Sequence, residues 1–276
     1  MRKIIVPTDF SSTAWNALSL CVRMFKYEVC EIFILHSIST DHPSEDQMKA
    51  SEEQLLEDSG KEISGLIKKT DEISANPRHQ FFSRVCSGSL VDEINELCDL
   101  EDIDVVVMGT TGRSAGRKKA IGSNTLAVIK FIKAPVLCVP SAYIFEDLEN
   151  ILFPTNYLIP YQNRELKLVE ELARRFVAQV HFLYASKFPP ELKRQQKNEQ
   201  FLAEFFKNNP TRFVFRNSAP LKLVIENFLK EINADLLVMV NSEHTYLSNL
   251  LTTESIDNFT LTGEIPLLVL QNLDRE

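Results

Sequence analysis

The amino-acid sequence predicts two tandem α/β domains, each built on a parallel β-sheet with helices on both of its faces. Short runs of β-branched residues alternate with amphipathic helical segments, which is the pattern of parallel sheets covered on both sides. The same order of strands and helices restarts near residue 150. The 276 residues, 44% of them hydrophobic, are enough for two domains of about 100–200 residues, each with its own core.

The first elements are predicted from apolar runs and from the turn residues between them. The run at 3–6 is a short strand, and a polar turn with cap-type residues leads from it into an amphipathic helix over 14–25. Apolar residues at 31–36 indicate a second strand. Leucines and isoleucines at helical spacing indicate a long charged helix from about 45 to 69, and a third strand follows over 79–85.

The rest of the first half continues this alternation. A turn at Ser87-Gly88 precedes a helix whose apolar residues recur at helical spacing over 90–97. The β-branched run at 104–108 is the fourth strand, and it ends at a glycine-rich loop. A helix over 124–131 then leads into the fifth strand at 135–140.

The second half of the chain repeats the first. Pro154 ends an apolar run as Pro7 does, and the two prolines are 147 positions apart. Asp104 and Asp235, at the start of the fourth strands, are 131 positions apart. We therefore expect a duplicated domain joined at about 141–150, in which the second copy has lost 16 residues from its second helix.

The glycine loop after the fourth strand has the composition of a phosphate-binding segment. Gly109 and Gly112 end the buried strand, and Gly122 and Ser123 precede the next helix. Glycines allow the backbone to approach a ligand closely, and a helix N-terminus favours an anion. The nine residues in between carry four cationic side chains and no acid: Arg113, Arg117, Lys118 and Lys119.

The second copy lacks this loop chemistry. Side chains stand at the glycine positions, and two carboxylates would face any phosphate. We therefore expect the second half to be a structural or partner-binding copy, and the glycines of the first half to be explained by a ligand rather than by the sheet. The corresponding residues are Val240, Glu243, Thr253, Glu254 and, at the position of Asp9, Asn156.

These residues resemble the universal stress protein family in its tandem two-domain form. The family motif G-x2-G-x9-G-[S/T] is matched at every spacing by Gly109, Gly112, Gly122 and Ser123. The family's aspartate after the first strand is matched by Asp9. The Pro-Val-Leu-Cys-Val run that begins at residue 135 looks like the family's dimerising fifth strand.

The resemblance implies the fold class and the division of the chain. Each domain would be flavodoxin-like (adenine nucleotide alpha hydrolase-like), with a five-stranded parallel sheet flanked by helices and ATP at the carboxyl ends of the strands. Residues 1–144 would form the domain with the intact nucleotide loop. Residues 148–276 would form a degenerate copy that lacks it.

The resemblance also implies the binding residues. Residues after the first strand and at the ends of the second and third strands would lie against the adenosine, and the glycine loop would hold the ribose and phosphates. A divalent ion such as Mg²⁺ would bridge phosphate oxygens. The implied site residues are Pro7, Thr8, Asp9, Ser37, Val85, Met108, Gly109, Gly112, Arg113, Gly122, Ser123 and Asn124.

Structural roles compete with ligand roles at single residues. Asp9 could cap a helix beside Ser11, and His36 suits a hydrogen-bonded structural histidine better than a base. The loop cations could form a solvated face, with only one of them on a phosphate. The five cysteines show no CxxC spacing, which favours buried thiols. We identify no catalytic and no metal-ligating residues.

Charge and hydropathy exclude two classes of partner, duplex nucleic acid and the membrane interior. The net charge of −8 without a basic stripe argues against duplex nucleic acid, and no run approaches the ~18 apolar residues of a membrane span. The N-terminus lacks a signal-type apolar region, so we expect a cytoplasmic protein. The resemblance adds a homodimer and a protein partner of unknown identity.

Three functions remain open from the sequence. The first is an ATP-binding protein of the stress response, regulatory in role, with the nucleotide held by the first domain only. The second is a slow ATP-hydrolysing enzyme at the same site, which depends on analogy of fold because no positioned base is evident. The third is an adaptor that binds no nucleotide.

Overall fold

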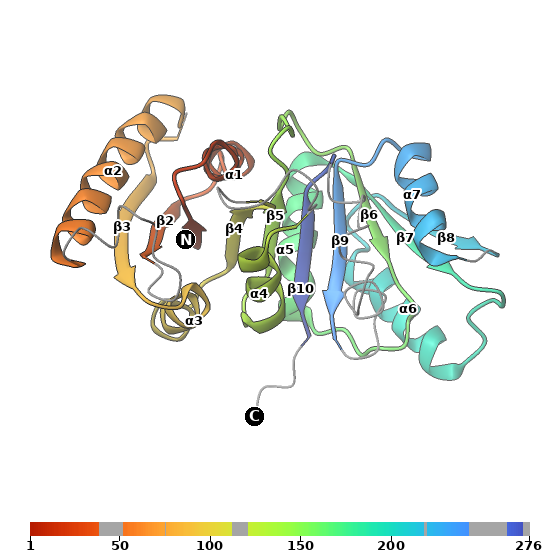
Figure 1. The fold of residues 1–276 in the computed structure, drawn as a ribbon. Helices are drawn as coiled ribbons and strands as arrows, with labels where there is room; N and C mark the ends of the chain where they lie inside the picture. The colour runs from red at the N-terminus through yellow and green to blue at the C-terminus, as the bar shows by residue number, and fades with distance from the viewer. Residues whose placement is uncertain (39–51, 75, 112–120, 218–219, 243–263, 273–276) are drawn as a thin grey trace. The chain divides into compact units, whose positions relative to one another are not determined.

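The chain forms two compact units in a computed structural model, Met1–Phe145 and Glu146–Glu276. The structure describes residues 1–38, 52–74, 76–111, 121–217, 220–242 and 264–272. Both units are α/β with parallel strands, as the sequence predicts (Figure 1).

The first unit has five parallel strands in the order β3-β2-β1-β4-β5. Adjacent strands pair in register, with Ile4 of β1 between Ile32 of β2 and Val105 of β4. The order reverses direction beside β1, which creates the crevice at the carboxyl ends where ligands of such sheets bind. The strands are β1 (Arg2–Pro7), β2 (Cys30–Ile38), β3 (His79–Ser87), β4 (Val105–Gly109) and β5 (Val136–Val139).

Helices cover both faces of this sheet (Figure 1). The pair α1 (Ser12–Met24) and α2 (Glu52–Ile73) lies on one side, and the pair α3 (Leu90–Glu101) and α4 (Ser123–Phe131) on the other. The central strands are buried on both faces, which explains why β4 reads as a continuous apolar run. The predicted start of the second helix, near Glu45, lies outside the described residues.

The second unit repeats this arrangement in the order β10-β9-β6-β7-β8, again with parallel pairing. The helix α6 has 13 residues where its counterpart α2 has 22, which agrees with the shortening inferred from the repeat. The elements are β6 (Asn150–Pro154), α5 (Asn163–Phe176), β7 (Gln179–Ala185), α6 (Lys193–Phe205), β8 (Thr211–Arg216), α7 (Leu221–Glu231), β9 (Leu236–Asn241) and β10 (Leu267–Gln271).

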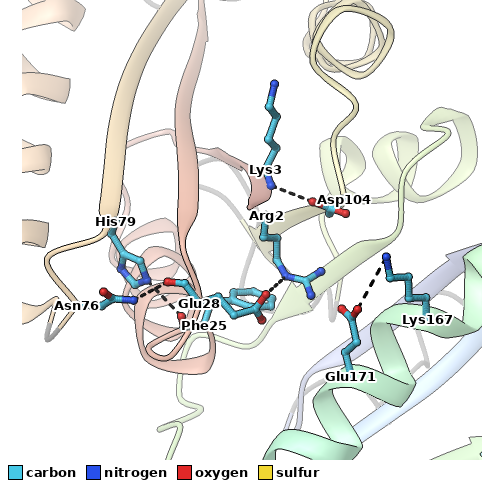
Figure 2. Close-up of polar contacts among 9 residues, drawn as sticks. All are labelled: Arg2, Lys3, Phe25, Glu28, Asn76, His79, Asp104, Lys167 and Glu171. Carbon is cyan, nitrogen blue, oxygen red and sulfur yellow. Dashed lines mark hydrogen bonds and ion pairs between the residues drawn. The ribbon is translucent and has the colours of Figure 1, made fainter.

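A cluster of polar contacts holds the amino ends of β1 and β3 in place in the first unit (Figure 2). Arg2 Nε is 2.8 Å from a carboxylate oxygen of Glu28, and the Arg2 guanidinium lies over the ring of Phe25. Asn76 donates to the carbonyl of Glu28, and His79 Nε2 lies 3.2 Å from the carbonyl of Phe25. These contacts stabilise the amino ends of the strands, at the end of the sheet opposite the predicted nucleotide loop.

Within the described ranges, no helix is both long enough and apolar enough to cross a membrane.

Candidate functional site

The turn after β1 is held by its own side chains. The backbone of Phe10 has φ 61°, which is uncommon for an aromatic residue. The Thr8 hydroxyl accepts the Phe10 N–H at 3.0 Å, and a carboxylate oxygen of Asp9 accepts the Ser11 N–H at 3.0 Å. Ser11 caps α1 by accepting the Ala14 N–H at 3.2 Å. The capping role that the sequence allowed for Asp9 therefore belongs to Ser11, while Asp9 fixes the turn before the cap.

His36 supports the same turn from the end of β2. Its Nδ1 lies 2.8 Å from the carbonyl oxygen of Thr8, and its ring centroid is 4.6 Å from that of Phe10. Both contacts agree with the structural role expected from the sequence. Val85 pairs with His36 across the β2–β3 ladder, and Ser37 donates its hydroxyl to the Gly88 carbonyl at 2.6 Å.

Gly109 has a packing reason to be glycine. A Cβ atom at this position would lie 2.7 Å from the Thr13 Cγ2 and 3.2 Å from the Thr13 carbonyl carbon and oxygen. The first turn of α1 thus packs directly on the end of β4. The sequence analysis attributed the glycines to a ligand rather than to the sheet, and at Gly109 the structure adds a packing reason that it did not foresee.

The start of α4 leaves backbone donors for a ligand. Gly122 is the N-cap, no side chain caps it, and its own N–H donates to the Thr110 carbonyl at 2.7 Å. Ser123 and Asn124 follow on the first turn and are exposed. Helix N-termini in this state favour anions because their first N–H groups have no partner within the helix.

The described residues of the predicted binding site lie at one end of the first sheet, where the carboxyl ends of its strands meet. The described ones lie at, or just after, the carboxyl ends of β1 to β4, or at the start of α4. This start is held beside the end of β4, because the Gly122 N–H donates to the Thr110 carbonyl at 2.7 Å and the Thr125 hydroxyl donates to the Gly109 carbonyl at 3.0 Å. Gly112 and Arg113 lie outside the described residues.

A cavity beside this edge involves residues that the sequence analysis did not single out. It has a volume of about 260 Å³ and lies between the β1 turn, α1 and α2. Its walls include Trp15, the sole tryptophan of the chain, one helical turn after the Asp9 segment. The place of this single tryptophan, shortly after Asp9 in the sequence, was the signal that could have indicated the cavity wall. The cavity is lined by Thr8, Phe10, Ser11, Ser12, Trp15, Leu66 and Lys69.

The second unit keeps the β1-type turn. Tyr157 has φ 56°, and its N–H donates to the Thr155 hydroxyl at 3.0 Å, as Phe10 donates to Thr8. Asn156 accepts the Leu158 N–H at 2.9 Å. Since the second copy lacks the glycine motif, this turn conformation does not depend on a nucleotide loop.

Aromatic rings lie near the carboxyl ends of β7 and β8 in the second unit. Tyr184 of β7 occupies the ladder position of His36, because the carbonyls of Leu35 and Leu183 accept the equivalent N–H groups after β1 and β6. The Tyr184 ring centroid is 5.5 Å from Tyr157 and 5.9 Å from Phe215. The first unit has only a histidine and a valine at the positions of Tyr184 and Phe215.

Two thiols of the first unit, those of Cys86 and Cys138, are unsuited to nucleophilic chemistry. Burial raises the pKa of Cys138 to about 12, and burial with nearby Glu93 raises that of Cys86 to about 11. Both are therefore protonated near neutral pH. Among the described residues, no group of three or more histidine, cysteine or acidic side chains could hold a metal ion.

Comparisons with known proteins agree on one family. The model of the universal stress protein family matches residues 1–140. One universal stress protein of Methanocaldococcus jannaschii is 28% identical over 142 residues, 50% of this chain and 81% of that protein. Another from this organism is 27% identical over 157 residues, 50% of this chain and 94% of its own. A solved universal stress protein of Archaeoglobus fulgidus, 15% identical, shares the fold over 99% of this chain and 97% of its own, with a TM-score of 0.70.

Proposed function

The chain belongs to the universal stress protein family, and from this premise we propose that it is an ATP-binding regulatory protein of the stress response. The nucleotide is held by the first unit alone, at the carboxyl ends of β1, β2, β3 and β4. The observation that carries the proposal is the glycine motif of residues 109–123, whose two ends fall at the end of β4 and at the uncapped start of α4.

The chemistry of the described part of this motif fits phosphates. The N–H groups at the start of α4 and the positive end of its dipole face the carboxyl edge, where an anionic group is stabilised. Thr8 and Asp9 follow the end of β1, the strand that pairs with β4, and in this proposal they contact the adenosine. A divalent ion such as Mg²⁺ would be held mainly by the phosphate oxygens.

Binding by the first unit alone is supported by the chemistry of its duplicate. Val240 and Thr253 replace the first and third glycines, and Glu254 replaces Ser123. Tyr184 and Phe215 add bulk at the ends of the neighbouring strands. In sequence, the second copy therefore has a carboxylate where the first has a hydroxyl.

The test is calorimetric titration of the whole chain with ATP, with and without Mg²⁺. In the main variant, Ser123→Glu, the change is at an exposed position in the first turn of α4, where a carboxylate is compatible with the helix but repels phosphate. We expect wild type to bind and Ser123→Glu to bind at least about tenfold more weakly, which corresponds to about 1.4 kcal/mol.

Ser64→Glu is the matched control, because it adds the same charge at an exposed position in α2. It should bind ATP like wild type. Gly122→Glu, a larger change at a buried position, should abolish binding. Equal affinities for wild type and Ser123→Glu, or no heat from wild type, would overturn the proposal.

A further inference from the structure

The strand β3 forms one edge of the first sheet. It pairs with β2 along its whole length, and among the described residues no strand pairs with its other side. The Gly88 N–H donates to the Ile38 carbonyl at the end of this ladder. Because successive residues of a strand direct their backbone groups alternately to the two sides, the N–H and C=O groups of Phe81, Ser83 and Val85 point away from β2. Such a row of backbone groups is a template for another strand.

The sequence of β3 does little to protect this edge. Edge strands are commonly protected by short length, charged side chains, proline or bulges. β3 has nine residues paired without a bulge, and it contains one arginine but no lysine, acid or proline. Its counterpart in the second unit, β8, has six residues and an arginine near each end, Arg212 and Arg216. Charge and short length therefore protect β8 but not β3.

The exposed side chains of β3 combine an aromatic ring with a cation. The Phe82 ring is 40% exposed and stacks on Phe33 of β2, with centroids 5.2 Å apart. Arg84 follows two residues later on the same face, where its guanidinium lies 4.0 Å from Glu93 and 3.9 Å from Glu96 of α3. The Arg84 side chain is 46% exposed, so these distant ion pairs leave its guanidinium accessible to a further partner.

We propose that β3 pairs with β3 of a second copy of this chain, antiparallel and centred on Ser83. The outward N–H and C=O groups of Ser83 then bond to those of Ser83 in the second copy. Phe82 lies opposite Arg84 of the second copy in a non-hydrogen-bonded pair, whose side chains are close enough for a cation–π contact. On the other face, Phe81 lies opposite Val85. The two-fold symmetry of such a pair makes both contacts twice.

A second copy is the occupant because β3 is complementary to itself in this register. Ser83 is the middle residue of the strand, so centring on it pairs all nine residues. Centring on Arg84 would instead place two arginines opposite each other, which is unfavourable. The surface differs from β5, the strand whose sequence resembles the dimerising strand of the family.

Sedimentation equilibrium of the whole chain tests the pairing. Ser83→Pro removes the central outward N–H, and an edge strand tolerates proline where the N–H does not face its neighbour. Ser83→Ala is the matched control, because it shortens the same side chain but keeps the N–H. At high protein concentration, we expect the mass of wild type and of Ser83→Ala to be twice that of Ser83→Pro. Urea denaturation shows whether Ser83→Pro is folded.

Ser83→Cys gives a second measurement that does not depend on a tolerated proline. Opposite residues of a hydrogen-bonded antiparallel pair have Cα atoms about 5.5 Å apart, within the range of about 4.4–6.8 Å that a disulfide spans. Oxidised glutathione should therefore link Ser83→Cys into covalent dimers at least about tenfold more than wild type. Ser64→Cys, with its cysteine exposed on α2, should behave like wild type.

Three results would overturn the inference. The first is a wild type that stays monomeric at high concentration, and the second is a folded Ser83→Pro with the same mass as wild type. The third is equal cross-linking of Ser83→Cys and Ser64→Cys, which would show that the two copies of β3 do not meet at Ser83.

Discussion

Gly109 shows how strongly one missing Cβ determines the packing of α1 on β4. In Gly109→Ala the new methyl group would lie 2.7 Å from the Thr13 Cγ2, a distance that real Cβ atoms avoid, so the Thr13 side chain, α1 or β4 must shift. Overpacking of this kind costs about 1–3 kcal/mol. We expect the free energy of unfolding, measured by urea denaturation, to fall by that amount.

Gly65→Ala in α2 is the control, because a Cβ there meets nothing within 4 Å. Alanine is favoured over glycine within a helix by about 1 kcal/mol, so this variant should be as stable as wild type or more stable. The double change Gly109→Ala with Thr13→Ser removes the closest methyl group and should recover part of the loss. A Gly109→Ala protein as stable as wild type would contradict the packing argument.

The sequence could identify Gly109 but not the reason for it. Its spacing to Gly112 and Gly122 indicates a phosphate loop, and the valine at the same place in the second copy indicates that the sheet tolerates a side chain there. The contact that excludes a Cβ comes from Thr13, nearly a hundred residues earlier in the chain. Such a contact depends on the angle at which a helix crosses a strand, which no residue pattern encodes.

Two buried histidines should make the stability depend on pH. Burial lowers the pKa of His79 and of His181 below 6.5. The unfolded chain therefore binds protons at a higher pH than the folded chain does, and the free energy of unfolding should fall as the pH drops below about 6.5. Each histidine adds a slope of at most about 1.4 kcal/mol per pH unit.

Urea denaturation at several pH values between 5 and 7.5 measures this slope. The comparison is His79→Gln, which keeps hydrogen-bonding groups but cannot titrate. Its stability should depend less steeply on pH than that of wild type between about pH 5 and 6.5. Identical slopes for the two proteins would show that His79 does not contribute to the pH dependence.

Among the elements, α6 stabilises the second unit through amide side chains. Asn198 donates two hydrogen bonds to carbonyls of the turn after β6. Asn198→Ala leaves both carbonyls without this donor, and each lost bond costs about 0.5–1.5 kcal/mol. We expect a loss of about 1–3 kcal/mol in the free energy of unfolding, measured by urea denaturation.

Lys197→Ala is the control, because Lys197 is exposed on the preceding position of the same helix. Its stability should stay within about 0.5 kcal/mol of wild type. If both variants lost the same stability, the cause would be the helix itself and not the contact with the turn.

The strands and their order of appearance were predictable, because buried parallel strands are continuous apolar runs. The shortened α6 followed from the spacing of the repeat. The cavity of the first unit and the amide contacts of α6 were not predictable, since they depend on where Lys69 and Asn198 lie along helices whose contacts are set by tertiary packing. Likewise, nothing in the pattern of β7 shows that Tyr184 stacks on a residue of β8.

The whole molecule contains one fold in two chemical versions. Both units keep the strained aromatic turn after their first strand, with Phe10 in one and Tyr157 in the other. The first unit combines that turn with an uncapped helix start and an open cavity. The second fills the same edge with aromatic rings and amide side chains. Under the proposed function, the two units share their strands and this turn but not the residues that hold a nucleotide.

This division predicts that ATP stabilises only the first unit. A ligand at 100 times its dissociation constant stabilises the species that binds it by about 2.7 kcal/mol. In hydrogen exchange of the whole chain with ATP, exchange should slow in the turn of residues 8–11 and at the start of α4. The equivalent turn of residues 155–158 should exchange at its unliganded rate. Ser123→Glu with the same ATP supplies the control and should show no slowing, whereas equal slowing of both turns would contradict binding by the first unit alone.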